Sequence, residues 1–112
     1  MTSPVARDVK LEVTLPAEWL TGRVEVHQVR LLPGTPVGAH VHNGPVFGSI
    51  VTGSAVYQID GGQPSTLVAG DVFYEPEGAR IARFDATAEG VTFLAYYLLA
   101  AGERPEISFV EA

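Results

Sequence analysis

Short strand-like segments, separated by turns that contain glycine or proline, make up most of this 112-residue sequence. Between residues 22 and 99, no stretch of eleven or more residues has the 3.6-residue periodicity of an amphipathic helix. A parallel sheet needs crossover helices, so the pattern argues against one and predicts an all-β sandwich or barrel. The expected strands are residues 9–15, 23–32, 37–42, 47–52, 55–59, 65–68, 72–75, 79–84 and 91–99.

The two ends of the chain differ from its middle. Residues 9–15 alternate apolar and polar side chains, which predicts a half-buried N-terminal strand. The C-terminal tail, residues 101–112, is polar except around residues 107–110, so it is either a loose tail or a strand exchanged with a partner subunit. We expect one domain over residues 1–112, with its barrel core at about residues 23–100.

The composition limits the partners and the chemistry. Seven basic against thirteen acidic residues give a formal charge of −6, and the only lysine is Lys10, so we expect no nucleic-acid partner. There is no cysteine, which leaves histidine and carboxylate side chains as the strong metal ligands. The longest apolar stretch, residues 91–101, is too short to cross a bilayer. The first ten residues do not resemble a signal peptide, so we expect no membrane association and a cytoplasmic location.

Two of the three histidines, His40 and His42, are separated by one residue within an expected strand. Successive side chains of a strand point to opposite faces, so this spacing puts both imidazoles on one face, where they can share a metal ion. An isolated pair is weak evidence, since two histidines on a solvated face give the same pattern. His27 is a poorer candidate, because it shares its face with Arg23 and Glu25 on an expected outer strand.

The residues around this pair resemble the first motif of the cupin family, Gly-x5-His-x-His-x(3,4)-Glu-x6-Gly. Gly34, His40, His42 and Gly53 are in register with it, and Val46 stands at the glutamate position.

A second segment resembles the second cupin motif, Gly-x5-Pro-x-Gly-x2-His-x3-Asn. Gly70, Pro76 and Gly78 match it, while Ile81 and Asp85 stand at the histidine and asparagine positions. The two motifs occur in the family's order on a chain that we expect to be all-β.

The resemblance covers roughly residues 24–99 and implies a double-stranded β-helix, or jelly-roll barrel, that binds a small molecule inside. A typical cupin metal site uses both histidines of the first motif, its glutamate and the histidine of the second. Two of these four ligands are replaced here by Val46 and Ile81. The resemblance therefore leaves two readings open, one divalent ion (Fe, Mn, Ni or Zn) or no metal at all.

Glu75 is the best candidate for a replacement ligand. It precedes the Pro76 turn at the end of an expected strand, and with the two histidines it would form a two-histidine, one-carboxylate set. The alternative is a solvated glutamate at the strand end, or one paired with Arg80 or Arg83. Which alternative holds depends on whether the pleat of the strand turns the Glu75 side chain toward the barrel interior or toward solvent.

Polar side chains near the expected barrel interior are candidates for ligand binding. Tyr57, Gln58 and Tyr74 have polar ends that could orient a small molecule. Arg83 lies two residues after Ile81, on the same strand face, and could attract a carboxylate, although a solvated arginine explains it as well.

Three functions remain open. The first is a small-molecule-binding cupin of unassigned activity, with a weakly held divalent ion at His40 and His42. The second is a metal-dependent enzyme of dioxygenase or isomerase type that uses these histidines and Glu75. The third is a non-catalytic module that binds a metabolite or a sugar. In each case we expect a homodimer, because a barrel this small leaves apolar outer strands to cover.

Overall fold

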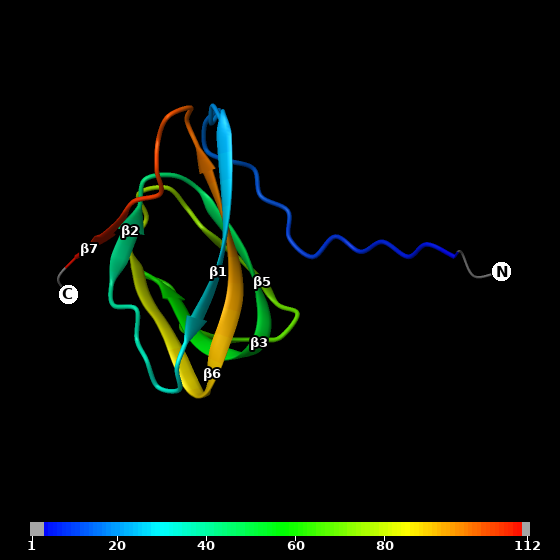
Figure 1. Ribbon diagram of the computed structural model, residues 1–112, viewed down its shortest axis with the longest axis vertical. Coiled ribbons are helices and arrows are strands. Elements are labelled where there is room, and N and C mark those ends of the chain that lie inside the picture. Colours follow the sequence, from blue (N-terminus) through cyan, green and yellow to red (C-terminus); the bar gives the residue numbers. More distant parts are fainter. Residues whose placement is uncertain (1–3, 111–112) are drawn as a thin grey trace.

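The computed structural model describes residues 4–110 and shows one curled antiparallel sheet (Figure 1). The order of its strands is β4-β3-β6-β2-β7, with β1 on β6 and β5 on β3. The all-β prediction is confirmed, and none of the residues within 4–110 forms a helix long and apolar enough to span a membrane. The strands are β1 (Arg23–Leu31), β2 (His40–His42), β3 (Val46–Ile59), β4 (Ser65–Val68), β5 (Val72–Glu75), β6 (Ile81–Leu99) and β7 (Ile107–Phe109).

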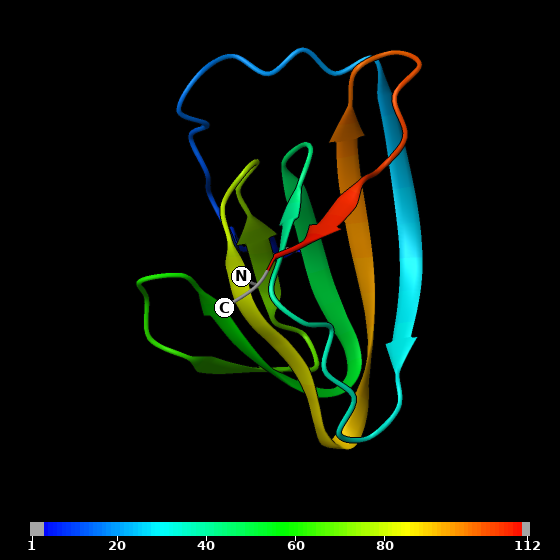
Figure 2. The same cartoon turned by 90° about the vertical axis from the view of Figure 1, so that its left-hand side faces the viewer.

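Two long strands, β3 and β6, form the spine of the barrel and bend to enclose its interior (Figure 2). The sequence predicted two shorter strands within each of them. The expected break after Gly53 is instead a β-bulge, at which the register of β3 on β6 shifts. Gly53 has a φ of +76°, and a Cβ atom there would lie 2.0 Å from the carbonyl oxygen of Gly90. This glycine therefore bends a continuous strand and does not end it.

The interior is filled mainly by aromatic and branched side chains. The Phe73 ring lies over Gly48, where an added Cβ atom would come within 2.1 Å of it. It also contacts the rings of Phe84 and Phe93, with centroids 5.3 and 6.0 Å apart. These aromatic rings separate the closed half of the barrel, around Tyr57, from an open cavity near β2.

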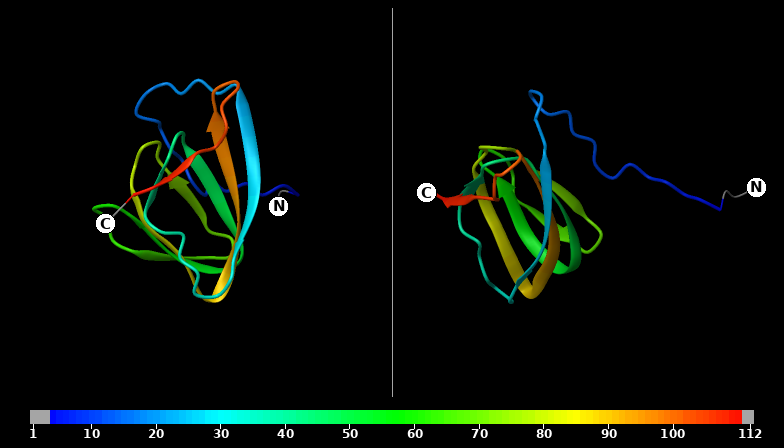
Figure 3. Two further views of the ribbon diagram at one scale, coloured as in Figure 1. Left: turned by 60° about the vertical axis from the view of Figure 1, so that its left-hand side comes forward. Right: turned by 45° about the horizontal axis from the view of Figure 1, so that its top comes forward.

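Residues 9–15 do not form the strand that their alternation predicts. The segment is extended on the outside of the barrel (Figures 1 and 3), where its residues 9–11 line a surface pocket with residues of β3, β5 and β6, and its Val9 side chain is 78% exposed. A strand needs a hydrogen-bonded neighbour, and within residues 4–110 no strand pairs with this segment. Its visible attachment is a hydrogen bond from Lys10 Nζ to the carbonyl oxygen of Gly70.

The C-terminal tail is neither loose nor exchanged in this structure. Its residues Ile107–Phe109 form β7, which pairs antiparallel with β2 of the same chain. His40 lies opposite Phe109, and His42 lies opposite Ile107. Figure 2 shows this segment crossing beside β2. The strand that carries both histidines is thus covered by a segment that follows it by some sixty residues.

Candidate metal centre

His40 and His42 both point into the barrel from β2. Their exposed fractions are 3% and 7%, while Val41 between them is only half-buried. The imidazole rings are 4.9 Å apart, edge to face. The prediction that both histidines share one face is confirmed, and that face is the buried one.

Glu75 ends β5 with its carboxylate directed at the same two imidazoles. Its Oε1 atom lies 2.6 Å from Nε2 of His42 and 3.4 Å from Nε2 of His40, and the residue is 3% exposed. The alternative partners are engaged elsewhere, because Arg80 pairs with Asp60 and Arg83 with Asp85. The pleat of β5 therefore turns Glu75 inward.

These three side chains form a donor set that could hold a metal ion. One ligand atom from each lies within 4.8 Å of the other two, and all three residues are buried. The Nδ1–H group of His40 donates a 2.8 Å hydrogen bond to the Gly38 carbonyl oxygen, so Nε2, which faces Glu75, is the nitrogen that can bind an ion when it gives up its proton. Such a bond behind an imidazole is typical of metal-ligating histidines, because it fixes the tautomer and the ring orientation.

His42 lacks this support. Its Nδ1 atom is buried and has no hydrogen-bond partner within residues 4–110. The ring is held instead through Nε2, at the centre of the triad. A buried nitrogen without a partner is uncommon in proteins, and this one is the ring nitrogen of His42 that does not contact Glu75.

The electrostatics of the triad also favour a cation at its centre. Burial acts to lower the pKa of His40, but the hydrogen bonds to Glu75 and to the Gly38 carbonyl outweigh it and leave this pKa raised. Burial acts to raise the pKa of Glu75, but the hydrogen bonds from both histidines leave it lowered. The pocket thus stabilises an ionised carboxylate beside positive charge, which a proton or a metal ion can supply.

A cavity of about 160 Å³ adjoins the triad. Besides the three triad residues, the Tyr97 side chain brings a polar group to its wall, and the remaining lining is apolar. The lining residues are Val29, Val37, His40, His42, Val46, Phe73, Glu75, Phe84, Phe93, Ala95, Tyr97 and Ile107.

None of the four residues predicted to orient a ligand lines this cavity. Tyr57 packs behind two lining rings, those of Phe73 and Phe84, and its hydroxyl donates a 2.8 Å hydrogen bond to the Tyr74 carbonyl oxygen. Burial raises the pKa of Tyr57, with a further contribution from the charge of Glu75. Tyr74 itself stacks on Phe47, away from the cavity.

The other two predicted pocket residues lie in polar surface contacts. Gln58 donates a hydrogen bond to the Gly62 carbonyl oxygen, across the turn after β3. Arg83 is half-exposed and pairs with Asp85, on its own strand, at 2.8 Å. Position 83 does not share the inward orientation of Ile81, which is fully buried.

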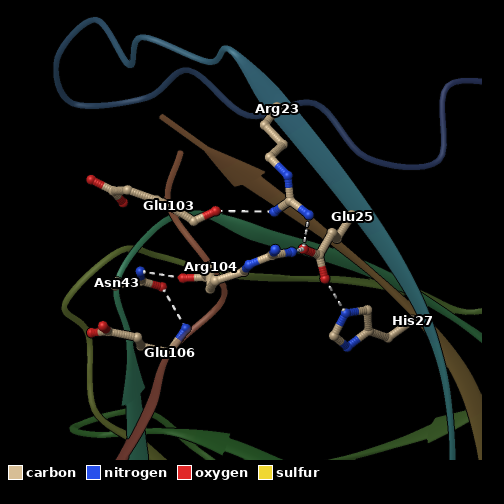
Figure 4. A network of polar contacts seen from close by, with 7 residues as sticks. All are labelled: Arg23, Glu25, His27, Asn43, Glu103, Arg104 and Glu106. Carbon is tan, nitrogen blue, oxygen red and sulfur yellow. Dashed lines mark hydrogen bonds and ion pairs between the residues drawn. The ribbon is translucent and has the colours of Figure 1, made fainter. Parts of the chain in front are cut away.

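A polar network that the sequence analysis did not connect to the site lies beside the cavity (Figure 4). Glu25 on β1 accepts ion pairs from Arg23 and from Arg104 (3.6 Å) and a 2.8 Å contact from Nε2 of His27. The hydrogen bond with His27 is the main cause of a lowered pKa at Glu25. His27 lies outside the triad, as predicted, yet it sits on the half-buried face of β1 with Glu25.

Tyr97 links this network to the triad. Its ring contacts His27 at a centroid distance of 4.7 Å and His42 at 5.9 Å. Burial raises the pKa of Tyr97, and the charges of Glu75 and Glu25 add to the effect, so its hydroxyl stays protonated. Only the pairing of β1 with β6 reveals this role, because it places Glu25 directly opposite Tyr97.

Asn43, the residue after His42, forms hydrogen bonds with the segment that precedes β7. Its side-chain amide donates to the Arg104 carbonyl oxygen at 3.0 Å and accepts from the Glu106 backbone N–H at 2.9 Å (Figure 4). The next residue, Ile107, lines the cavity. One side chain therefore connects the end of β2, which carries both histidines, to the segment that forms part of the cavity wall.

Residues 27–94 match the family model described as the cupin domain. This is more than half of the chain, so the protein belongs to the cupin family, as its two sequence motifs indicated. A search of curated proteins found no match.

Several solved structures have the same fold. The chain is similar to a Bacillus subtilis oxalate decarboxylase studied for its Mn(II) centres, with 26% identity, a TM-score of 0.63, and coverage of 71% of this chain and 22% of that one. It is also similar to the DMSP lyase DddQ from Ruegeria pomeroyi DSS-3, with 19% identity, a TM-score of 0.66, and coverage of 74% of this chain and 42% of that one. An oxalate oxidase in complex with the substrate analogue glycolate matches comparably (21%, TM-score 0.66, coverage 78% and 46%). The chain spans less than half the length of each.

Proposed function

We propose that this cupin is a metal-dependent enzyme that holds one divalent ion through His40, His42 and Glu75. The observation that carries the proposal is the convergence of three buried donor atoms within 4.8 Å of one another beside an apolar cavity. Catalytic metal sites commonly keep three protein ligands and leave a position for substrate, whereas structural sites are closed. A structural neighbour at 26% identity has Mn(II) centres, which supports an ion of the Mn, Fe, Ni or Zn group.

The chain's own residues prepare the site for such an ion. The Gly38 carbonyl orients His40, and the walls of the cavity exclude bulk water from the donor atoms. Tyr97 presents a protonated side chain to the cavity, where it can donate a hydrogen bond to a bound molecule. The ion would act as a Lewis acid on an oxygen-bearing substrate or bind dioxygen, as two-histidine, one-carboxylate sites do with iron.

Metal content tests the proposal directly. Protein purified without chelator should contain about one divalent ion per chain, and reloading stripped protein with Fe, Mn, Ni or Zn should raise its melting temperature. Glu75→Gln should abolish both effects. His27→Gln, which removes the histidine outside the triad, is the matched control and should retain them. The absence of stoichiometric metal from the wild type, with no thermal shift on reloading, would refute the metal centre and leave a metal-free binding module.

Oxygen uptake separates the two reaction classes within this proposal. A dioxygenase consumes dioxygen in proportion to substrate, while an isomerase works equally well under argon. Iron-loaded and zinc-loaded protein should therefore be assayed in parallel, because zinc has no redox chemistry.

We further propose that the chain works as a homodimer in which residues 9–15 pair with a second copy. This segment has the alternation of a strand but no strand partner among residues 4–110 of its own chain, and the exposed face of β1 carries Val24 and Val26. Light scattering at micromolar concentration should give twice the chain mass of 11.9 kDa. Removal of residues 1–16 should give the monomer mass, and a monomeric full-length chain would contradict the proposal.

A further inference from the structure

We infer that the substrate of this centre is a monoanion with a compact apolar body, whose charged end binds at the metal. The inference rests on the proposed metal centre and adds the chemical class of its ligand. Dicarboxylates and sugars are thereby disfavoured.

The charge balance of the cavity indicates a ligand with a single negative charge. A divalent ion beside one ionised carboxylate, Glu75, leaves a net charge of +1, since neutral imidazoles add nothing. Among the described residues that line the cavity there is no lysine, no arginine and no second carboxylate. One anionic group therefore neutralises the site, while a second would be buried without a counter-charge, which is costly in an apolar environment.

The walls indicate what the rest of the ligand is. Three aromatic rings, those of Phe73, Phe84 and Phe93, and several aliphatic side chains face the cavity away from the triad. Apart from Tyr97, these walls have no polar side chain to receive the hydroxyl groups of a sugar. An apolar body gains free energy by leaving water here, and a polyhydroxylated one loses hydrogen bonds.

The volume limits the size of this body. An apolar cavity of roughly 150 Å³ is large enough for one benzene molecule. The cavity here has about 160 Å³, so the part of the ligand that lies inside it is a branched aliphatic or single-ring body.

The two arginines that pair with Glu25 do not change the charge balance inside the cavity. Arg23 and Arg104 both pair with Glu25, and neither lines the cavity. Glu25 partly compensates their charges, so they can attract anions toward the cavity without neutralising a second charge inside it.

Four small ligands that differ at one end test the inference on zinc-loaded protein. 4-Methylpentanoate, succinamate and succinate share a carboxylate head and a similar shape, but end in an isopropyl group, an amide and a second carboxylate. 4-Methylpentanamide keeps the apolar body and lacks the anion. Isothermal titration at pH 7.5 should show 4-methylpentanoate binding at least about tenfold more tightly than each of the other three, which corresponds to about 1.4 kcal/mol.

A charge added to the cavity wall gives a second readout. Ile107 lines the cavity and is 44% exposed, so Ile107→Lys is expected to fold and to place a cation beside the ligand. This variant should gain affinity for succinate relative to 4-methylpentanoate. Ser108→Lys adds the same charge on the opposite face of β7 and should leave the ratio unchanged.

The outcomes separate this inference from the proposed function. If the protein binds none of Fe, Mn, Ni and Zn, the metal centre itself fails, and with it the inference. If zinc binds but succinate matches or exceeds 4-methylpentanoate, or neither acid binds, the metal centre stands and the monoanion inference is wrong. An unchanged ratio in Ile107→Lys would also contradict the charge argument.

Discussion

Val46 and Glu75 are direct partners across the antiparallel ladder of β3 and β5. Val46 stands where the first cupin motif has its glutamate. Side chains directly opposite each other in a ladder point to the same face, with Cβ atoms about 4.5–5.5 Å apart. The missing carboxylate has therefore been replaced from the neighbouring strand, and the donor set keeps its two-histidine, one-carboxylate composition.

Because positions 46 and 75 are direct partners, we predict that a carboxylate at position 46 can replace the one at position 75. Glu75→Val should weaken metal binding by more than the roughly 10–100-fold that loss of an outer-shell partner costs. The double variant Val46→Glu with Glu75→Val should recover most of it, because the new carboxylate enters the same cavity from the opposite strand. Metal titration against a competing chelator measures both. Failure of the double variant to bind more tightly than Glu75→Val would show that the two positions are not equivalent.

The second missing ligand can be restored separately. Ile81 lies opposite His40 in the pairing of β2 with β6, so Ile81→His should put a third imidazole beside the triad. We expect higher metal affinity and a larger gap in melting temperature between loaded and stripped protein, since a buried imidazole without metal is destabilising. Ile81→Asn, which is polar but a weak ligand, is the matched control. If the gap in melting temperature is no larger than that of the wild type, Ile81 does not lie beside the triad as the pairing of β2 with β6 predicts.

Gly48 is predicted to be intolerant of even one added carbon. A Cβ atom there would overlap the Phe73 ring, so Gly48→Ala should lower the free energy of unfolding by about 1–3 kcal/mol, the usual cost of overpacking a core. Phe73→Leu combined with Gly48→Ala should lose less than the sum of the two single variants, because the smaller side chain relieves the overlap. Urea denaturation measures all four proteins, and additive losses would rule out this contact as the cause.

The network around Glu25 predicts a dependence of stability on acid. The pKa of Glu25 is lowered from its ordinary value of 4.5, so its ionised form stabilises the fold above that pH and is lost as the pH falls through the lower, folded-state value. The stability difference between wild type and Glu25→Gln should therefore be full near neutral pH and shrink below pH 4.5. Glu12→Gln, on the exposed N-terminal segment, should show a much flatter profile. High salt should reduce the Glu25 effect, because the pairs are close to solvent.

Local sequence patterns were sufficient to predict the bounds of the short strands β4 and β5, which the structure confirms. They failed where strand identity depends on distant contacts. Gly53 has the signature of a turn, yet a neighbouring strand holds it inside β3. The strand predicted from the alternation of residues 9–15 was wrong, because no pattern within seven residues can say whether a partner strand exists.

The metal triad was predictable and the cavity wall was not. Spacing alone placed His40 and His42 on one face, and the strand end made Glu75 a candidate. Arg83 was misplaced because a bulge between Ile81 and Arg83 changes which residues of β6 point inward. Tyr57 does point inward, but it packs behind the rings of Phe73 and Phe84 and does not reach the cavity. Tyr97 was missed because its importance comes from neighbours on other strands.

The pairing of β7 with β2 has a consequence for the order of assembly. All three residues of the triad precede residue 76, whereas Ile107, which forms part of the cavity wall, belongs to the last strand. During synthesis the ligands emerge from the ribosome before the strand that covers them. An ion that binds to these residues would therefore first meet an incomplete cavity wall, which the docking of β7 would then complete.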